Sequence, residues 1–202
     1  GGETAEMPGV YQPGEIDLVG TVVGVVERGS ILDGSRVQAG DAILALPSSG
    51  LHTNGYSLAR RVLDDLDWTV PCDDLNGVSI GDALLAVHRA YLEPVRRLWD
   101  AQIDVRALAH ITGGGVIDNL PRVLPDGLGA EIQRGSWPEP PVFALIQAQG
   151  EVSDSEMFRV FNRGLGMLVV IPAAQVEAAR NTVDVFHVGG IVAGSEGVHI
   201  VG

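Results

Sequence analysis

Cysteine is almost absent from this 202-residue sequence, which contains only Cys72. One thiol cannot form an internal disulfide and cannot supply a multi-cysteine metal site. We therefore expect a cytoplasmic protein in which Cys72 is an ordinary surface or half-buried thiol. No apolar run approaches the length of a membrane span and no signal peptide is visible, so no membrane partner is expected.

Positive charge is also scarce. The sequence has 13 Lys and Arg residues against 26 Asp and Glu residues, which gives a formal net charge of −13. Nucleic acids and anionic membranes are polyanions, so this balance argues against either of them as the main partner. A phosphorylated small molecule remains compatible with it, because a local pocket can oppose the field of the whole protein.

Three common site motifs are missing as well. The glycines match neither a Walker-type phosphate loop nor a dinucleotide-binding fingerprint, and no side-chain spacing typical of a metal site occurs. We therefore predict no metal ligands among these residues. A phosphate site in this chain must be built on a different pattern.

The sequence does contain an irregular alternation of apolar strand-like runs and helix-like segments. Its length and its 46% of hydrophobic residues suffice for one domain, or one domain plus a fragment of another. The alternation predicts an α+β fold of the α/β-sandwich kind, in which a mixed β-sheet is flanked by helices. Strands are expected at 17–27, 42–47, 103–109, 129–133, 168–171, 183–188 and 198–201, and helices near 58–66, 82–85, 88–99, 116–123, 142–147, 153–157 and 173–180.

The first expected strand, 17–27, is long and apolar and has no obvious neighbour before it. An extended strand needs neighbours along its edges. Turn signals follow it, so we divide the chain into residues 1–27, a loop and this strand, and residues 28–202. The sequence starts without a methionine, inside what looks like a motif. We therefore expect a fragment, with the partner of strand 17–27 in a missing part or a second subunit.

The stretch from Ala107 to Leu120 carries the strongest functional signal. An apolar run ends at His110 and Thr112, the glycines Gly113 to Gly115 follow, and a helix-like segment begins. Glycine allows close approach of a ligand, and the free N–H groups at a helix start favour an anion. The pattern predicts a phosphate-ester site edged by His110 and Thr112. The alternative is a glycine-rich turn after an ordinary strand-end histidine.

A second strand, polar glycine loop and helix occur at 42–66. In this loop Ser49 and Asn54 could bind an anion, or simply cap the helix, and His52 could be structural instead of catalytic. A third glycine-marked loop, 161–167, contains Asn162, which either faces the pocket or forms the turn.

Other polar residues receive simpler interpretations. Arg89 and Tyr91 could touch a ligand, but the pattern favours a salt-bridged helix face. The histidines His187 and His199 lie in apolar strands and are expected to be structural or exposed.

Six motifs stand in a fixed order along the chain: residues 1–9 (GGETAEMPG), 17–27, 48–57 (SSGLHTNGYS), 109–115 (AHITGGG), 119–125 (NLPRVLP) and 161–167 (FNRGLGM). Together they resemble the phosphoribosylformylglycinamidine cyclo-ligase family of purine biosynthesis, also called aminoimidazole ribonucleotide (AIR) synthetases. The resemblance spans nearly all of the chain, and the set is far more specific than any one motif.

The resemblance implies the C-terminal domain of the AIR-synthetase-like fold, preceded by a remnant of an N-terminal ATP-binding domain. It implies ATP-dependent cyclisation of formylglycinamidine ribonucleotide to aminoimidazole ribonucleotide, with Mg shielding the phosphate charge. In the family, ATP and Mg are held mainly by the N-terminal half, and two such halves pair in a dimer. We therefore expect a homodimer, a phosphorylated small-molecule substrate, and no activity of this chain by itself.

The resemblance also assigns roles to single residues. It would place Glu3 and Thr4 near the nucleotide. The cleft between the halves and the substrate site would be formed by Ser49, Gly50, His52, Asn54, His110, Thr112, Gly113, Gly114 and Gly115. His110, ahead of His52, would move a proton during ring closure, and Asn162 would support the site from behind.

Two alternatives remain at this stage. One is a related ATP-using enzyme of the same fold, such as formylglycinamidine ribonucleotide synthetase or a hydrogenase-maturation or selenophosphate enzyme. The other is a non-catalytic ligand-binding or dimerisation module. The amino-acid sequences of the loops at 48–57 and 109–115 favour the cyclo-ligase.

Overall fold

The computed structural model describes residues 14, 16 and 19–202, so Glu3 and Thr4 lie outside it. The chain divides into two units, Gly1–Ile31 and Leu32–Gly202. In the first unit, residues 19–27 form no strand, and one 3-10 turn follows at Arg28–Ser30. The predicted strand 17–27 is thus not found in its described part. A strand needs a neighbour to pair its backbone groups, and the described residues of this unit provide none.

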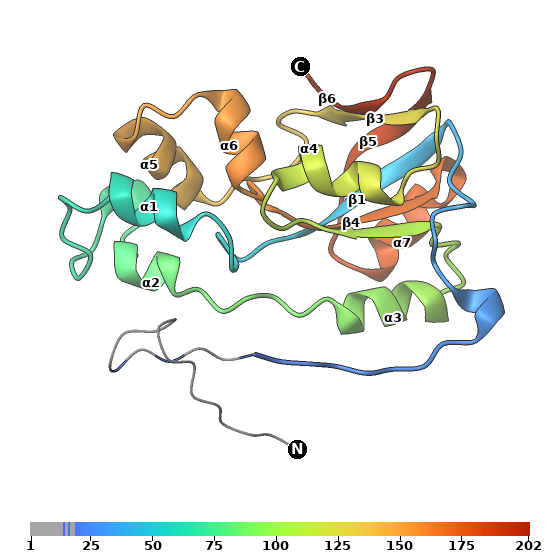
Figure 1. Cartoon of the computed structure of the whole chain (residues 1–202), viewed down its shortest axis with the longest axis horizontal. Coiled ribbons are helices and arrows are strands. Elements are labelled where there is room, and N and C mark those ends of the chain that lie inside the picture. The colour runs from blue at the N-terminus through green and yellow to red at the C-terminus, as the bar shows by residue number, and fades with distance from the viewer. Residues whose placement is uncertain (1–13, 15, 17–18) are drawn as a thin grey trace. The chain divides into compact units, whose positions relative to one another are not determined.

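The second unit is built on a six-stranded sheet with the order β2-β4-β1-β5-β3-β6 (Figure 1). All neighbouring strands are antiparallel except β3 and β6, which are parallel. This mixed sheet with flanking helices confirms the predicted α+β fold. The strands are β1 (Asp41–Pro47), β2 (Ala107–His110), β3 (Leu128–Gln133), β4 (Leu165–Pro172), β5 (Phe186–Ala193) and β6 (Gly197–Val201).

Short helices cover this sheet and extend beyond one end of it. They are α1 (Tyr56–Val62), α2 (Ile80–Leu84), α3 (Leu92–Asp100), α4 (Gly115–Asn119), α5 (Pro141–Gln149), α6 (Asp154–Val160) and α7 (Val176–Thr182). Among the described residues, no helix is long and apolar enough to cross a membrane.

Strand β1 is buried on both faces, which explains its uninterrupted apolar sequence. Successive side chains of a strand point to opposite faces. Ile43 and Ala45 therefore join the core beneath α4 and α6, whereas Leu44 and Leu46 join the core beneath α3 and α7. Figure 1 shows α4 and α3 on opposite sides of the sheet.

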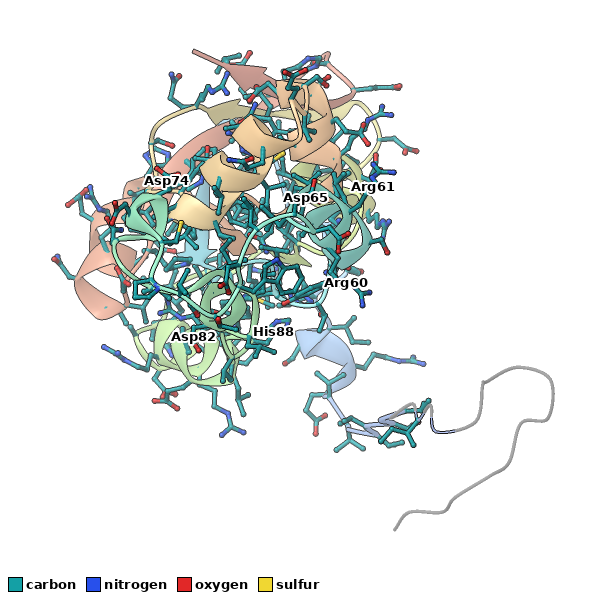
Figure 2. All side chains as sticks on the ribbon, turned by 90° about the vertical axis from the view of Figure 1, so that its left-hand side faces the viewer. Arg60, Arg61, Asp65, Asp74, Asp82 and His88 are labelled. Carbon is teal, nitrogen blue, oxygen red and sulfur yellow. The ribbon has the colours of Figure 1, made fainter. Side chains whose placement is uncertain are left out.

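A third hydrophobic cluster lies beside the sheet, among α1, α2 and α5. Leu51 and Leu63 pack there with Phe143, Ile146 and Phe161, all almost fully buried. Figure 2 views this end of the molecule, where Arg60, Asp82 and His88 are labelled. The loop from β1 to α1 therefore runs between the sheet and this helical cluster.

Strand order brings the predicted loops to one edge of the sheet. Strands β1 and β2 lie on either side of β4 and are both antiparallel to it, so they run in the same direction. Pro47 at the end of β1 pairs with Leu165, and His110 at the end of β2 pairs with Met167. The loops that follow β1 and β2, and the loop that precedes β4, consequently meet at this edge.

Three predicted elements differ from the structure. The helix expected at 88–99 begins only at Leu92, because Pro94 falls in its first turn, where a missing N–H is tolerated. Of the strand expected at 103–109, only Ala107–His110 pairs regularly. The strand expected at 183–188 lies later, at Phe186–Ala193, while Val183 and Val185 pack in the core beneath α3 and α7.

Candidate functional site

The loop that follows β1 (48–55) is held in place by the buried side chain of Asn162. Its Nδ2 donates to the carbonyl oxygens of Gly50 at 2.9 Å and Leu51 at 3.2 Å. Its Oδ1 accepts from Ser48 Oγ at 2.8 Å and from the Gly164 N–H at 2.8 Å. Both polar atoms of the Asn162 amide are therefore hydrogen-bonded within the protein, and this side chain holds the loop in place from the protein interior.

The loop that follows β2 (111–114) is tied by another buried asparagine, Asn119. Its Nδ2 donates to the carbonyl oxygens of Thr112, Gly113 and Gly115 at 3.3, 3.2 and 2.7 Å. The Thr112 hydroxyl donates to Asn119 Oδ1 at 3.1 Å. The hydroxyl predicted to edge the site is thus half-buried and already hydrogen-bonded within its own loop.

The three glycines occupy three different environments. Gly115 has φ +60°, and a Cβ on it would lie 1.9 Å from the Phe158 carbonyl oxygen, so α6 packs directly against its backbone. Gly114 has φ +95° and faces the side chain of Asp118. Gly113 is exposed, and a Cβ there would meet only Asn54 Oδ1, at 3.4 Å. The two loops therefore meet where Asn54 approaches Gly113.

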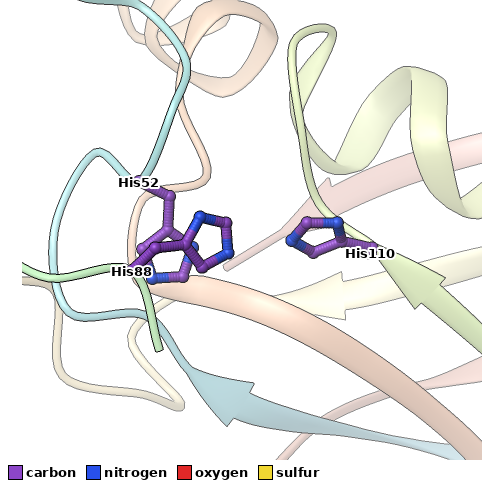
Figure 3. A group of neighbouring side chains, drawn as sticks. All are labelled: His52, His88 and His110. Atoms are coloured by element: carbon purple, nitrogen blue, oxygen red, sulfur yellow. The ribbon is translucent and has the colours of Figure 1, made fainter. Parts of the chain in front are cut away.

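Three histidines gather at the mouth of these loops. The rings of His52 and His88 stack with centroids 3.8 Å apart and an angle of 17° between their planes. The His110 ring lies 5.4 Å from that of His88, tilted by 47°. Figure 3 shows His110 facing the His52–His88 pair from the end of β2. Both histidines predicted from the sequence are thus in one site, joined by a third.

His52 is the most constrained member of this group. It has φ +59° and its side chain is 4% exposed. Its Nε2 accepts a hydrogen bond from the Ser49 N–H at 3.1 Å, so the neutral ring carries its proton on Nδ1. Nδ1 is buried and has no hydrogen-bond partner.

The environment of His52 and of His110 favours the neutral form of each imidazole. Burial, and then the neighbouring His88, His110 and Arg89, together lower the pKa of His52 to about 4. Burial, and then His88, also lower the pKa of His110. Neutral imidazole accepts a proton or donates a lone pair, so the site offers proton acceptors at neutral pH.

His88 was not predicted as a site residue, and Tyr91 was interpreted as part of a helix face. Both errors arose because residues 86–91 were not recognised as a connector. They lie in the irregular segment between α2 and α3. The Tyr91 hydroxyl donates to the Pro47 carbonyl oxygen at 3.1 Å, and burial raises its pKa to about 12. Arg89 lies 3.5 Å from the same oxygen and forms no ion pair with a described residue, so the salt-bridged helix face is wrong. No spacing in the sequence pointed to His88.

The remaining predicted residues surround the histidines. Ser49 is exposed, and its hydroxyl donates to the Val87 carbonyl oxygen at 2.6 Å, which fastens the first loop to the connector. Gly50 is buried. A groove of about 330 Å³ opens beside His88 and His110, and the rest of it is lined by Tyr91 and by apolar side chains from α3, β2 and β4.

Three carboxylates close enough to share a magnesium ion are not found among the described residues. Among them, the only group of three or more His, Cys, Asp or Glu side chains close enough to share an ion is His52, His88 and His110. Mg²⁺ prefers oxygen ligands, usually carboxylates with water and phosphate. The predicted nucleotide contacts Glu3 and Thr4 lie outside the described residues.

Comparison with known proteins identifies the domain. Residues 38–202 match the family model "AIR synthase related protein, C-terminal domain". The phosphoribosylformylglycinamidine cyclo-ligase of Paraburkholderia phymatum is 49% identical over 183 residues, covering 89% of this chain and 50% of that protein. The cyclo-ligase of Gloeobacter violaceus is 48% identical over 199 residues, covering 95% and 58%. This chain thus spans about half the length of these relatives.

Solved structures show the same fold at low sequence identity. A thiamine-monophosphate kinase from Stenotrophomonas maltophilia aligns with a TM-score of 0.57 and 19% identity, over 88% of this chain and 55% of that one. A hydrogenase maturation protein HypE, solved in complex with ATP, aligns with a TM-score of 0.53 and 17% identity over 83% and 50%. The sequence relatives are more specific: this chain belongs to the phosphoribosylformylglycinamidine cyclo-ligase family, and most of it is the family's C-terminal domain.

Proposed function

We propose that this chain forms the substrate-binding half of an ATP-dependent cyclo-ligase. The reaction closes formylglycinamidine ribonucleotide to aminoimidazole ribonucleotide, with release of ADP and phosphate. The observation that carries the proposal is the identity of 48–49% to named cyclo-ligases over about 90% of the chain. The meeting of the two predicted loops at one edge of the sheet supports it.

Within this site, we assign the glycine loop and the histidines to the reacting amide end of the substrate. The carboxylate of Asp118 lies beside Gly114, and a carboxylate at a helix start repels a phosphate dianion. The amide end is uncharged and needs positioned donors and acceptors instead. Exposed Gly113 and half-buried Asn54 are the groups best placed to contact it.

His110 is better suited than His52 to move a proton during ring closure. The free lone pair of His52 already accepts the Ser49 N–H, and its ring is buried. His110 is exposed, borders the groove and has a lowered pKa, so it is a neutral base that a ligand can reach. Loss of the amidine proton to such a base completes the ring.

ATP bound with Mg²⁺ would supply the activation of the formyl oxygen. No three carboxylates among the described residues lie close enough to share that ion, and the chain spans about half the length of its relatives. We therefore propose that the nucleotide is held mainly by the other half of the full-length enzyme. The chain alone is then inactive, and the full-length protein is a cytoplasmic homodimer.

Calorimetric titration of the purified chain tests this proposal. Formylglycinamidine ribonucleotide should bind to the wild-type chain, and ATP with Mg²⁺ should not. His110→Ala in the full-length enzyme should lower kcat by about 10²–10⁴-fold, the usual range for a general base, with little change in KM. Unchanged turnover would remove His110 from the mechanism, and cyclisation by the chain alone would overturn its assignment as an inactive half.

A second candidate is a non-catalytic ligand-binding module of the same fold, which would use the groove beside His88 and His110 as its binding site. Substrate binding without turnover is common to both candidates. Mixing the chain with a separately produced N-terminal half of a relative distinguishes them, because only a severed enzyme half should restore cyclisation.

A further inference from the structure

The histidine cluster has a property that ring closure does not require. His52, His88 and His110 each offer a ring nitrogen, and these three nitrogens all lie within 4.8 Å of one another. No carboxylate belongs to the group. Within residues 19–202, no other group of three or more His, Cys, Asp or Glu side chains comes as close together.

A second observation also points to an absent ligand. His52 Nδ1 is the one buried side-chain nitrogen or oxygen that lacks a hydrogen-bond partner in the described part of the chain. A buried polar atom without a partner is costly, and proteins generally retain one only where a ligand, ion or water completes it. Because the side chain is 4% exposed, solvent cannot readily do so.

From these observations we propose that His52, His88 and His110 bind one divalent transition-metal ion of the zinc class. Imidazole nitrogen suits Zn²⁺, Cu²⁺ and Ni²⁺, whereas Mg²⁺ and Ca²⁺ prefer oxygen. Three protein nitrogens also leave one tetrahedral position free for water or an oxygen of a small ligand. The site is separate from any nucleotide-bound magnesium. A bound ion would occupy the lone pair of His110, so His110 cannot act as the base of ring closure while the metal is bound.

Metal binding would require the histidine rings to move from their positions in the structure. His52 and His88 are stacked, so their nitrogens lie side by side and do not converge on one point. His88 belongs to a connector without regular secondary structure, and its ring can turn about its own side-chain bonds. A metal at the unpartnered His52 Nδ1 needs the lone pair of that atom, so the ring proton must move to Nε2 and the hydrogen bond from the Ser49 N–H is lost. We therefore expect micromolar affinity, weaker than a preorganised structural zinc site.

Zn²⁺ titration of the tag-free, chelator-treated full chain tests the proposal directly. One equivalent should bind, with competition by Co²⁺ but not by Mg²⁺. His88→Ala and His110→Ala should each weaken Zn²⁺ binding at least tenfold. These two side chains are not fully buried, so the variants are expected to fold, which far-UV circular dichroism can verify.

Matched controls separate this site from adventitious binding. His187→Ala and His199→Ala remove exposed histidines from β5 and β6, and Cys72→Ser removes the only thiol. None of the three should change the Zn²⁺ affinity. The proposal would be overturned if the wild-type chain showed no saturable Zn²⁺ binding. It would also be overturned if His88→Ala and His110→Ala bound Zn²⁺ as tightly as the wild type. Neither result would bear on cyclisation, because no turnover is measured.

Discussion

The two loops that build the site use the same device in different ways. Each is fastened by one buried asparagine, whose side-chain amide pairs with backbone groups that the tight loop leaves without partners. Asn119 lies within a few residues of the groups it binds, whereas Asn162 is more than a hundred residues from Gly50. The loop after β2 is therefore closed locally, and the loop after β1 forms only when β4 is in place beside it.

Substitution at the glycines tests the local loop, and we expect the largest effect there. Gly115→Ala should destabilise the protein by about 3–5 kcal/mol, because its Cβ would overlap the Phe158 carbonyl at an unfavourable φ. Gly113→Ala is the matched control and should cost no more than about 1 kcal/mol. Urea unfolding of both variants measures the difference. Equal costs would mean that α6 does not pack tightly on this loop.

Acid should destabilise the loop after β1 through its buried histidine, His52. The folded-state pKa of His52 is about 4, below its ordinary value of 6.5, so unfolding takes up a proton between these values. Stability is therefore fully present above pH 6.5 and falls as the pH is lowered to 4, by on the order of 3 kcal/mol.

His52→Gln isolates this contribution, because glutamine can still accept the Ser49 N–H but does not titrate. Denaturant unfolding of both proteins at several pH values between 6.5 and 4 gives the two slopes. The slope should be smaller in His52→Gln. Parallel curves would show that other groups, including His110 and the carboxylates, account for the whole acid sensitivity.

Removing each asparagine sharpens the comparison between local and distant anchoring. Asn162→Ala should cost about 2–3 kcal/mol, since two carbonyl oxygens and the Gly164 N–H lose their partner. Asn119→Ala should cost about 1–2 kcal/mol, because its loop can partly re-form with water. Hydrogen exchange should show increased opening of residues 48–55 only in Asn162→Ala. Opening of both loops in either variant would indicate that they form a single unit.

The smallest effect is expected at the contact between the first loop and the connector. Ser49→Ala removes the hydroxyl that donates to the Val87 carbonyl and should cost about 0.5–1 kcal/mol. It should also increase hydrogen exchange in residues 86–91 without changing α4. Unchanged exchange in that connector would show that Ser49 does not restrain His88.

Much of this fold could be predicted because its signals are local. Strand β1 is predicted by a continuous run of apolar residues. The start of α6 is predicted by Ser153, whose side chain accepts the N–H of Glu156 three residues later. The strand predicted at 17–27 was not formed in its described part, because strand formation depends on a neighbour that the apolar pattern cannot supply. Residues 86–91 were misread because the histidine and tyrosine there also fit a helix.

The residue pattern predicts the loops of the site, whereas only the resemblance to a known family places those loops together. His52, His110 and the glycines stand in polar loops that follow apolar strands, a pattern visible in the sequence. Their meeting depends on β4 inserting between β1 and β2, although it is far from both in the chain. His88 reaches the same place from a connector whose path depends on the packing of α2 and α3. Such proximity follows from the tertiary structure alone.

The insertion of β4 between β1 and β2 fixes the distance between the two loops of the site. Neighbouring strands lie about 4.8 Å apart, so two such steps separate the ends of β1 and β2 whatever the loops contain. Loop residues can therefore be exchanged to alter which molecule is recognised while the span between the two walls stays constant. A two-residue slip of β2 along β4 would instead displace His110 by about 7 Å and separate it from the other two imidazoles.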